Sequence, residues 1–283
     1  MTSSAKPLTV EDHRRDSAGM TYVYPVVSRR AGGVSIGINL NPNNACNWRC
    51  IYCQVPDLVR GGPPPLDLRQ LEDELRRLLE DIRSGAFMAE RVPDALRVLA
   101  DVAFSGNGEP TSAAEFPRAV AIVAKVLEEY GLAGQVKMRL ITNGSLLERA
   151  AVREGIALIG QAGGEVWFKL DGGSQAAMQR INGTRQTPVA ALRRLGLCAG
   201  LCETWVQSCF FALDGNSPGE RDVADYLQML ETAKANIAGV HLYGLARPSC
   251  QAEASRLGRL PSECLESLAM RIRAYGLTVR VSP

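Results

Sequence analysis

Three cysteines within eight residues carry the clearest chemical signal in this chain. Cys46, Cys50 and Cys53 follow the spacing C-x3-C-x2-C in the stretch ACNWRCIYCQ. Three thiolates from one short loop can hold three corners of a cubane iron–sulfur cluster, which leaves the fourth iron without a protein ligand. Because an open metal position is where a substrate or cofactor binds, the spacing predicts a reactive centre.

Two other interpretations of the three cysteines stay open at this point. A structural zinc site normally takes four Cys or His ligands, but no second C-x2-C pair is present, and His13 and His241 lie far away in the sequence. Cysteines are also often buried as small hydrophobic residues. Three so close together on a polar turn favour the cluster over both.

Length and composition describe an ordinary globular protein. The chain has 283 residues, 46% of them hydrophobic, and a formal net charge of +2, which gives no broad attraction to nucleic acid or membrane. Residues 1–20 contain no secretory signal, and no stretch approaches the ~18 consecutive apolar residues of a membrane helix. Eight cysteines without an export signal indicate a reducing compartment, so we expect a cytoplasmic protein.

Strand-like and helix-like segments alternate along the chain. Strands are expected at about 34–40, 96–104, 136–142, 165–170, 205–213, 239–245 and 278–281, and helices at about 68–83, 117–130, 146–161, 188–199, 219–235 and 261–275. This alternation predicts a parallel sheet covered by helices. We expect one α/β domain over residues 24–283, a partial or full (β/α) barrel of about six units, preceded by a poorly ordered or extended tail, residues 1–23.

Local signals sharpen some of these boundaries. Thr187 followed by Pro188 predicts a helix start, and Ser217 with Glu220 predicts a capping box. Gly37, inside the first expected strand, predicts a close approach of the backbone to a neighbour.

Polar and glycine residues follow the expected strands, where a barrel enzyme places its site. They are Gly106, Gly108 and Glu109 in SGNGEPT, Asn143 in TNGS, Lys169 and Asp171 in KLDGG, Gln207 and Cys209, and Arg247 and Cys250. Each is also ordinary turn chemistry, and Asp171 could cap a helix that begins near Ser174. Their coincidence at successive strand ends favours a functional site.

These motifs resemble the radical S-adenosylmethionine (SAM) superfamily, in particular the bacterial and archaeal group related to the tRNA wyosine synthases. The shared stretches are SRRAGGVSIGIN, CNWRCIYCQ, FSGNGEPT, ITNGSLL, WFKLDGG with RINGT, and ARP. The resemblance implies that Cys46, Cys50 and Cys53 ligate a [4Fe-4S] cluster whose open iron binds SAM. One electron would then split SAM into methionine and a 5′-deoxyadenosyl radical that abstracts hydrogen from an unidentified substrate.

The resemblance also implies roles for other residues. Tyr52 would approach the adenine of SAM, and Gly106, Gly108 and Glu109 would lie near its methionine amino group. Asn143, Lys169, Asp171 and Gln207 would contact its ribose or carboxylate, although Lys169 could equally pair with Asp171 in a structural salt bridge. A flavodoxin or ferredoxin would supply electrons. No catalytic residue beyond the cluster ligands is assigned.

The chain departs from the wyosine synthases in one respect. No cysteine precedes Cys46 to hold a second cluster, and no dense Lys/Arg stripe is present, which argues against tricyclic base formation on tRNA. RNA or tRNA base modification remains an alternative activity, as does an electron-transfer or metal-binding protein without SAM chemistry. The remaining cysteines are Cys198, Cys202, Cys209, Cys250 and Cys264; we expect buried or free thiols, with Cys209 or Cys250 as a minor candidate for facing the substrate. Trp167, Tyr243, Arg247 and Cys250 are candidates to line the substrate pocket.

Overall fold

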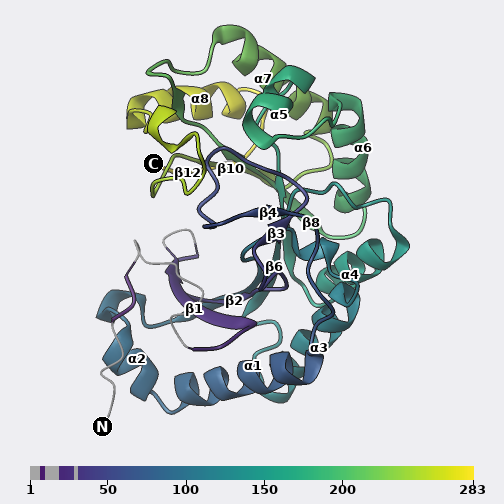
Figure 1. The fold of residues 1–283 in the computed structure, drawn as a ribbon, viewed down its shortest axis with the longest axis vertical. Helices are drawn as coiled ribbons and strands as arrows, with labels where there is room; N and C mark the ends of the chain where they lie inside the picture. Colours follow the sequence, from purple (N-terminus) through teal and green to yellow (C-terminus); the bar gives the residue numbers. More distant parts are fainter. Residues whose placement is uncertain (1–6, 10–18, 29–30) are drawn as a thin grey trace.

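The computed structural model describes residues 7–9, 19–28 and 31–283. Its main sheet has the strand order β1-β2-β5-β6-β7-β8-β10-β12. These strands are β1 (Val23–Ser28), β2 (Gly33–Ile38), β5 (Leu99–Phe104), β6 (Lys137–Thr142), β7 (Glu165–Lys169), β8 (Glu203–Cys209), β10 (Gly239–Tyr243) and β12 (Val279–Ser282). All neighbours are parallel except β1 and β2. The sheet curls without closing, so the expected barrel is confirmed in its partial form (Figure 1).

Helices cover the outer side of the curled sheet (Figure 1). They are α1 (Leu68–Arg83), α2 (Ala86–Arg91), α3 (Phe116–Glu129), α4 (Ala150–Gln161), α5 (Gln175–Asn182), α6 (Pro188–Ala199), α7 (Glu220–Ala233) and α8 (Ser262–Arg273). Two short ladders complete the described strands: β3 (Ala45–Cys46) with β4 (Val59–Arg60), and β9 (Ala212–Leu213) with β11 (Leu257–Gly258).

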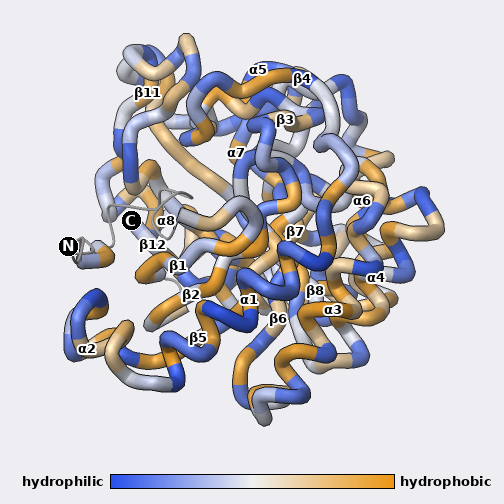
Figure 2. Tube along the Cα trace, turned by 60° about the horizontal axis from the view of Figure 1, so that its bottom comes forward, coloured by the Kyte–Doolittle hydropathy of each residue, from blue (hydrophilic) through white to orange (hydrophobic). Residues whose placement is uncertain are grey.

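The helices form because their apolar residues recur with helical spacing. In α1, Leu71, Leu75, Leu78 and Leu79 are buried, while the Asp67 side chain accepts the amides of Arg69 and Gln70 and so caps the first turn. Figure 2 shows hydrophobic and hydrophilic residues alternating along α1. In α8 the buried stripe is Leu265, Leu268, Ala269 and Ile272, as predicted.

Each central strand has two different buried faces. One face carries apolar side chains that pack in the main core, such as Val102, Leu140 and Val166. The alternating residues point to the inside of the curl, and these include charged groups such as Asp101 and Arg139. The strands are therefore apolar on the side that faces the helices and partly charged on the side that faces the cavity.

Local predictions had mixed outcomes. Thr187 caps α6 through the amide of Ala190, with Pro188 in the first turn, as predicted. The capping box at Ser217 is wrong, because α7 begins after Gly219, which makes no side-chain cap. Gly37 is needed for close packing, since the ring of Tyr24, its register partner on β1, occupies the space that a Cβ would fill.

The region expected as a tail is partly described. Leu8 is buried and its amide donates to the Arg91 carbonyl at 2.8 Å. The amides of Tyr22 and Val23 donate to the Glu74 carboxylate at 2.7 and 3.1 Å. Residues 1–6 and 10–18 of that expected tail lie outside the described residues.

No helix in the described part of the chain is long and apolar enough to cross a lipid bilayer.

Candidate functional site

The predicted strand-end residues meet at one edge of the sheet. A cavity of about 320 Å³ opens there and continues down the inner face of the curl. Ten of the eleven residues expected at the site line it: Cys46, Cys50, Tyr52, Cys53, Gly106, Gly108, Glu109, Asn143, Lys169 and Gln207. The eleventh, Asp171, lines a second pocket that shares Cys209 with this cavity. The structure thus brings these residues together at the carboxyl ends of the strands, the edge where barrel enzymes place their sites.

The cysteine loop follows β2 and is held by asparagine side chains. Asn41 Nδ2 donates to the Ala45 carbonyl at 3.0 Å and to Ser112 Oγ at 3.1 Å. Asn39 Oδ1 accepts the backbone amide of Asn107 at 3.1 Å. These bonds join the loop to the turn that follows β5, because backbone groups outside regular structure need side-chain partners.

Gly106 and Gly108 permit this close packing. A Cβ on Gly106 would overlap the Asn39 side chain, and one on Gly108 would overlap the Ala45 carbonyl oxygen. Gly106 also has a φ of 147°, which side-chain-bearing residues rarely adopt. The glycines thus bring the turn against the cysteine loop while both line the cavity.

The three cysteine side chains are partly buried and face the same cavity. The Trp48 amide lies 3.4 Å from Cys46 Sγ, and Asn182 Nδ2 lies 3.3 Å from Cys50 Sγ, so two sulfurs have N–H donors. Burial raises the pKa of Cys46 to about 11 and that of Cys50 to about 12. Burial thus disfavours the thiolate form of both cysteines. The positive charge of a bound iron would stabilise that form.

This donor set fits a cluster. Within the residues described, no three His, Cys, Asp or Glu side chains are placed to hold a single metal ion. Three sulfurs around a cavity, two of them with N–H donors, match the surroundings of an iron–sulfur group, whose potential depends on such hydrogen bonds.

Asp171 is the buried centre of a polar cluster beside Cys50. Its Oδ2 accepts Tyr52 Oη–H at 2.5 Å and Asn182 Nδ2 at 2.7 Å, and its Oδ1 accepts the amide of Cys209 at 2.8 Å. Asp171 does not cap α5, since Ser174 itself accepts the Ala177 amide there. That alternative for Asp171 is therefore wrong.

Lys169 lies between two tyrosines and Asp171. Its Nζ is 3.0 Å from Tyr243 Oη and 3.8 Å from Asp171 Oδ2, and it sits 5.0 Å from the centre of the Tyr52 ring. Burial by itself would lower the pKa of Lys169, but Asp171 and Tyr243 raise it above the ordinary value. The side chain therefore presents a fixed positive charge to the cavity.

Glu109 is fully buried and accepts four hydrogen bonds. Its Oε1 accepts Thr111 N at 3.2 Å, Thr111 Oγ1 at 2.6 Å and Thr142 Oγ1 at 2.5 Å, and its Oε2 accepts Asn143 N at 2.7 Å. Burial raises the pKa of Glu109, against the effect of these donors. The carboxylate ties the end of β5 to the end of β6.

Asn143 and Gln207 differ in how their amides are used. Asn143 Nδ2 donates to Asn47 Oδ1 of the cysteine loop at 2.8 Å, and its Oδ1 accepts Ser145 N at 3.0 Å. Gln207 lies on the inner face of β8, is only 2% exposed, and lines the cavity. Its side-chain amide forms no hydrogen bond with another described residue, so this group is available to a molecule in the cavity.

Sequence reasoning missed Asn182, Asn47 and the segment after β10. Ser249 Oγ donates to the carbonyls of Ile51 and Cys53 at 2.7 and 3.1 Å, and Gln251 Nε2 donates to that of Val55 at 2.9 Å. Asn182 belongs to the RINGT motif, which had been noted without a role. The contacts of the later segment join positions almost 200 residues apart, and no local signal indicates them.

The other candidate pocket residues and cysteines differ in whether they line the cavity. Trp167, Tyr243, Arg247 and Cys209 line the cavity, whereas Cys250 is exposed and touches the cysteine loop through its backbone amide, 2.9 Å from the Cys53 carbonyl. Cys198 and Cys202 are buried away from the site, beside Thr204 and the Gly164 carbonyl respectively, and Cys264 is exposed on α8.

Two known proteins are similar to this chain over part of their length. The chain is 30% identical over 158 residues to UPF0026 protein MJ1312 of Methanocaldococcus jannaschii, covering 56% of this chain and 42% of that protein. It is 26% identical over 134 residues to the protein named GTPase Obg of Brachyspira hyodysenteriae, covering 47% of this chain and 17% of that one. The chain thus spans less than half the length of these curated relatives, and it contains no G-x4-G-K-[ST] nucleotide loop.

The fold has solved counterparts. A structure of TYW1 with a bound lysine–pyruvate adduct superposes with a TM-score of 0.57 at 16% identity, covering 86% of this chain and 74% of that one. At this identity the likeness establishes the fold alone. The family model described as the radical SAM superfamily matches residues 40–230, more than half of the chain and the whole cysteine site, so this protein belongs to the radical SAM superfamily of enzymes.

Proposed function

We propose that this protein cleaves SAM reductively and uses the product to abstract hydrogen from a substrate bound in the same cavity. Cys46, Cys50 and Cys53 would hold the [4Fe-4S] cluster, and SAM would occupy the upper cavity beside them. The bound cluster would supply one electron to SAM, which would yield methionine and a 5′-deoxyadenosyl radical. The observation that carries this proposal is the continuity of one cavity from the cysteines to the interior of the sheet.

The protein's own groups match the polar ends of SAM. Lys169 offers a fixed positive charge suited to a carboxylate, and the Gln207 amide offers both a donor and an acceptor. We assign the Tyr52 ring to the adenine side and Asn143 to the ribose or carboxylate. Gly106, Gly108 and Glu109 would shape the wall near the amino group, with Glu109 acting through the backbone that it ties together.

Asp171 would act as a positioning residue. Its contacts with Tyr52, Asn182 and Lys169 fix three groups around the cluster at once. The ion pair with Lys169 was the structural alternative for the lysine, and at 3.8 Å it leaves Nζ able to reach another anion. One lysine can therefore serve both the protein and the cofactor.

An electron-transfer protein without SAM chemistry is the competing function. Such a protein needs no polar cavity beside its cluster, whereas here Lys169, Asn143 and Gln207 surround one. RNA or tRNA base modification is the alternative activity, and its support is the resemblance of the sequence motifs to the tRNA wyosine synthases. We also propose a cytoplasmic location and a flavodoxin or ferredoxin as the electron donor, on the strength of family membership.

Anaerobic reconstitution tests the proposal. The wild-type protein, loaded with iron and sulfide and supplied with dithionite and SAM, should release 5′-deoxyadenosine, measured by chromatography. Cys50→Ala should lose both cluster absorbance and product, while Cys264→Ala, an exposed cysteine on α8, should retain both. A fully loaded wild-type cluster that gives no 5′-deoxyadenosine, even with cell extract present, would leave the electron carrier as the better interpretation.

A further inference from the structure

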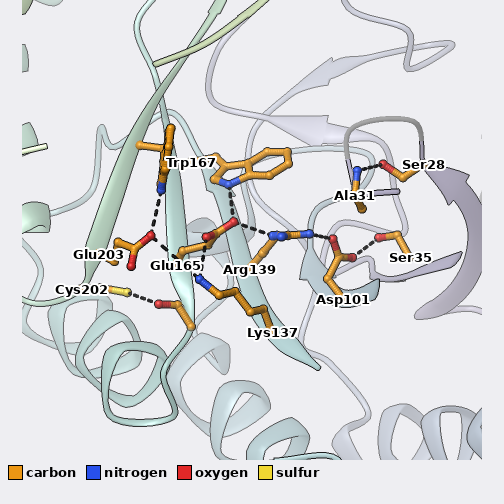
Figure 3. A network of polar contacts seen from close by, with 12 residues as sticks. Ser28, Ala31, Ser35, Asp101, Lys137, Arg139, Glu165, Trp167, Cys202 and Glu203 are labelled. Atoms are coloured by element: carbon orange, nitrogen blue, oxygen red, sulfur yellow. Dashed lines mark hydrogen bonds and ion pairs between the residues drawn. The ribbon is translucent and has the colours of Figure 1, made fainter. Parts of the chain in front are cut away.

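The lower part of the cavity, below the cysteines, contains none of the residues assigned above to the cluster or to SAM. Its lining includes Ser35 on β2, Asp101 on β5, Arg139 on β6 and Trp167 on β7. Asp101 lies four residues before Ser105, so at ~3.3 Å per strand residue it is about 13 Å below the edge that carries the site. Figure 3 shows these side chains converging inside the sheet.

The strand register places these groups next to one another. Ser35 is opposite Asp101, and Arg139 is opposite Glu165. Ser35 Oγ and Arg139 Nη1 both donate to the Asp101 carboxylate, and Arg139 Nε donates to Glu165 Oε1 at 2.6 Å (Figure 3). The guanidinium therefore bridges two buried carboxylates.

The second carboxylate has partners of its own. Glu165 Oε2 accepts Lys137 Nζ at 3.2 Å, and Glu165 Oε1 accepts Trp167 Nε1 at 2.9 Å. Lys137 is 44% exposed, whereas the side chains of Asp101 and Glu165 are almost wholly buried. Glu165 is thus fully satisfied inside the protein.

The charges of this network cancel. Asp101 and Glu165 carry two negative charges, and Arg139 and Lys137 carry two positive charges. Beyond the network, Lys137 also lies 3.9 Å from Glu203, which is exposed to solvent, and higher in the cavity Lys169 pairs with Asp171 at 3.8 Å. A charged ligand would therefore bring an uncompensated charge into a buried site, which is unfavourable.

The network still offers hydrogen bonds to the cavity. Arg139 is 12% exposed, and no described residue accepts from its Nη2. The oxygens of Asp101 have lone pairs beyond those used by Ser35 and Arg139. A donor thus lies beside an acceptor, and the apolar side chains of Val26 and Ile141 also line this cavity.

We propose that the lower cavity binds the substrate through a neutral carboxamide or lactam group, whose oxygen accepts from Arg139 and whose N–H donates to Asp101. This inference rests on the proposed function, because it places the substrate below the SAM site. It names a class of substrate that carries an uncharged amide-like end about 13 Å below the rim. Small molecules and extended substituents can reach that depth, whereas the surface of a folded macromolecule cannot.

Three probes of similar shape and different charge test whether the lower cavity prefers an uncharged group: benzamide, which is neutral, benzoate, which is negative, and benzamidine, which is positive. Binding to the cluster-loaded protein with SAM present would be measured by saturation-transfer NMR. We expect benzamide to bind at least tenfold more tightly than either charged probe. Tighter binding of benzoate or benzamidine, or no detectable binding of benzamide, would overturn the inference.

Charge-changing variants sharpen the test. Asp101→Asn leaves one excess positive charge and should shift the preference to benzoate, while Arg139→Gln leaves one excess negative charge and should shift it to benzamidine. Asp81→Asn, at an exposed position on α1, should leave the preference unchanged. A preference that stays the same in both interior variants contradicts the proposal.

Separate control measurements check that each variant folds and that it cleaves SAM. Circular dichroism establishes that each variant folds, and iron content establishes that it takes up the cluster. Ser35→Ala keeps every charge, so it should weaken benzamide binding severalfold without changing the order of affinity of the three probes. Release of 5′-deoxyadenosine is followed in the same samples. If the wild type cleaves SAM but does not select benzamide, only this inference fails; if it selects benzamide but never cleaves SAM, only the proposed function fails.

Discussion

Asn182 Nδ2 lies 3.3 Å from Cys50 Sγ and 2.7 Å from Asp171 Oδ2. One buried amide thus joins a proposed cluster ligand to the carboxylate that orients Tyr52 and Lys169. The side chain comes from the end of α5, whose preceding residue, Ile181, also accepts the amide of Ile51 in the cysteine loop at 2.9 Å. The position of the Cys50 sulfur and the orientation of the Asp171 cluster are therefore set by the same helix.

Asn182→Ala should lower the reduction potential of the cluster. An N–H donor to a sulfur stabilises the more negative, reduced state, and a bond of ~1 kcal/mol corresponds to roughly 40 mV for one electron. Potentiometric titration followed by electron paramagnetic resonance measures the shift, with Asn236→Ala, at an exposed position, as the control. An unchanged or higher potential would show that the bond to Cys50 does not tune the cluster.

Glu109→Ala should destabilise the protein substantially. It removes the acceptor of four buried donors, and each donor left unsatisfied costs ~1–3 kcal/mol, although relaxation shares that cost. We expect the free energy of unfolding to fall by about 2–4 kcal/mol. Urea denaturation of the cluster-free protein measures it, and Glu128→Ala, an exposed site on α3, should change stability by less than ~0.5 kcal/mol.

The double variant Ser249→Ala/Gln251→Ala should lose its cluster faster. These side chains hold the carbonyls of Ile51, Cys53 and Val55, and loss of about two hydrogen bonds at ~1 kcal/mol each permits the loop to open roughly tenfold or more often. The half-life of cluster absorbance in the presence of a chelator reports this opening. Ser255→Ala, exposed in the next turn, should behave as the wild type; equal half-lives for all three proteins would contradict the role of this segment.

Asp101 should make stability depend on pH. Burial raises its pKa above the usual value, although Arg139 and Ser35 oppose the shift. A carboxyl group whose pKa is raised in the folded state binds its proton more tightly there, so its contribution to stability is present below the unfolded pKa and is lost as pH rises through the folded pKa. Relative to Asp101→Asn, the unfolding free energy of the wild type should decrease as the pH rises above the ordinary aspartate pKa of about 4. Parallel curves for the two proteins in urea denaturation would exclude the raised pKa.

The amino-acid sequence by itself determined the architecture and pointed to the cysteine loop. Helical spacing in α1 and α8, the Thr187 cap and the strand-and-helix alternation are local properties, encoded within a few residues of each other. The C-x3-C-x2-C spacing is local as well, so the three cysteines could be proposed as cluster ligands before any contact was known. The residues at successive strand ends followed from one rule, that parallel strands present their carboxyl ends at the same edge.

The tertiary structure decided what depends on register and on contacts distant in the sequence. The antiparallel strand β1 is not among the expected strands, because its pairing with β2 is visible only in the sheet. The charged alternation in KMRLIT and EVWFK is present in the sequence, but only the register of β5, β6 and β7 brings Asp101, Arg139 and Glu165 together. Asn182 reaches Cys50 across 132 positions, and Ser249 reaches Cys53 across 196. Such pairs are fixed by the packing of the whole curled sheet, and no short segment of the chain contains that information.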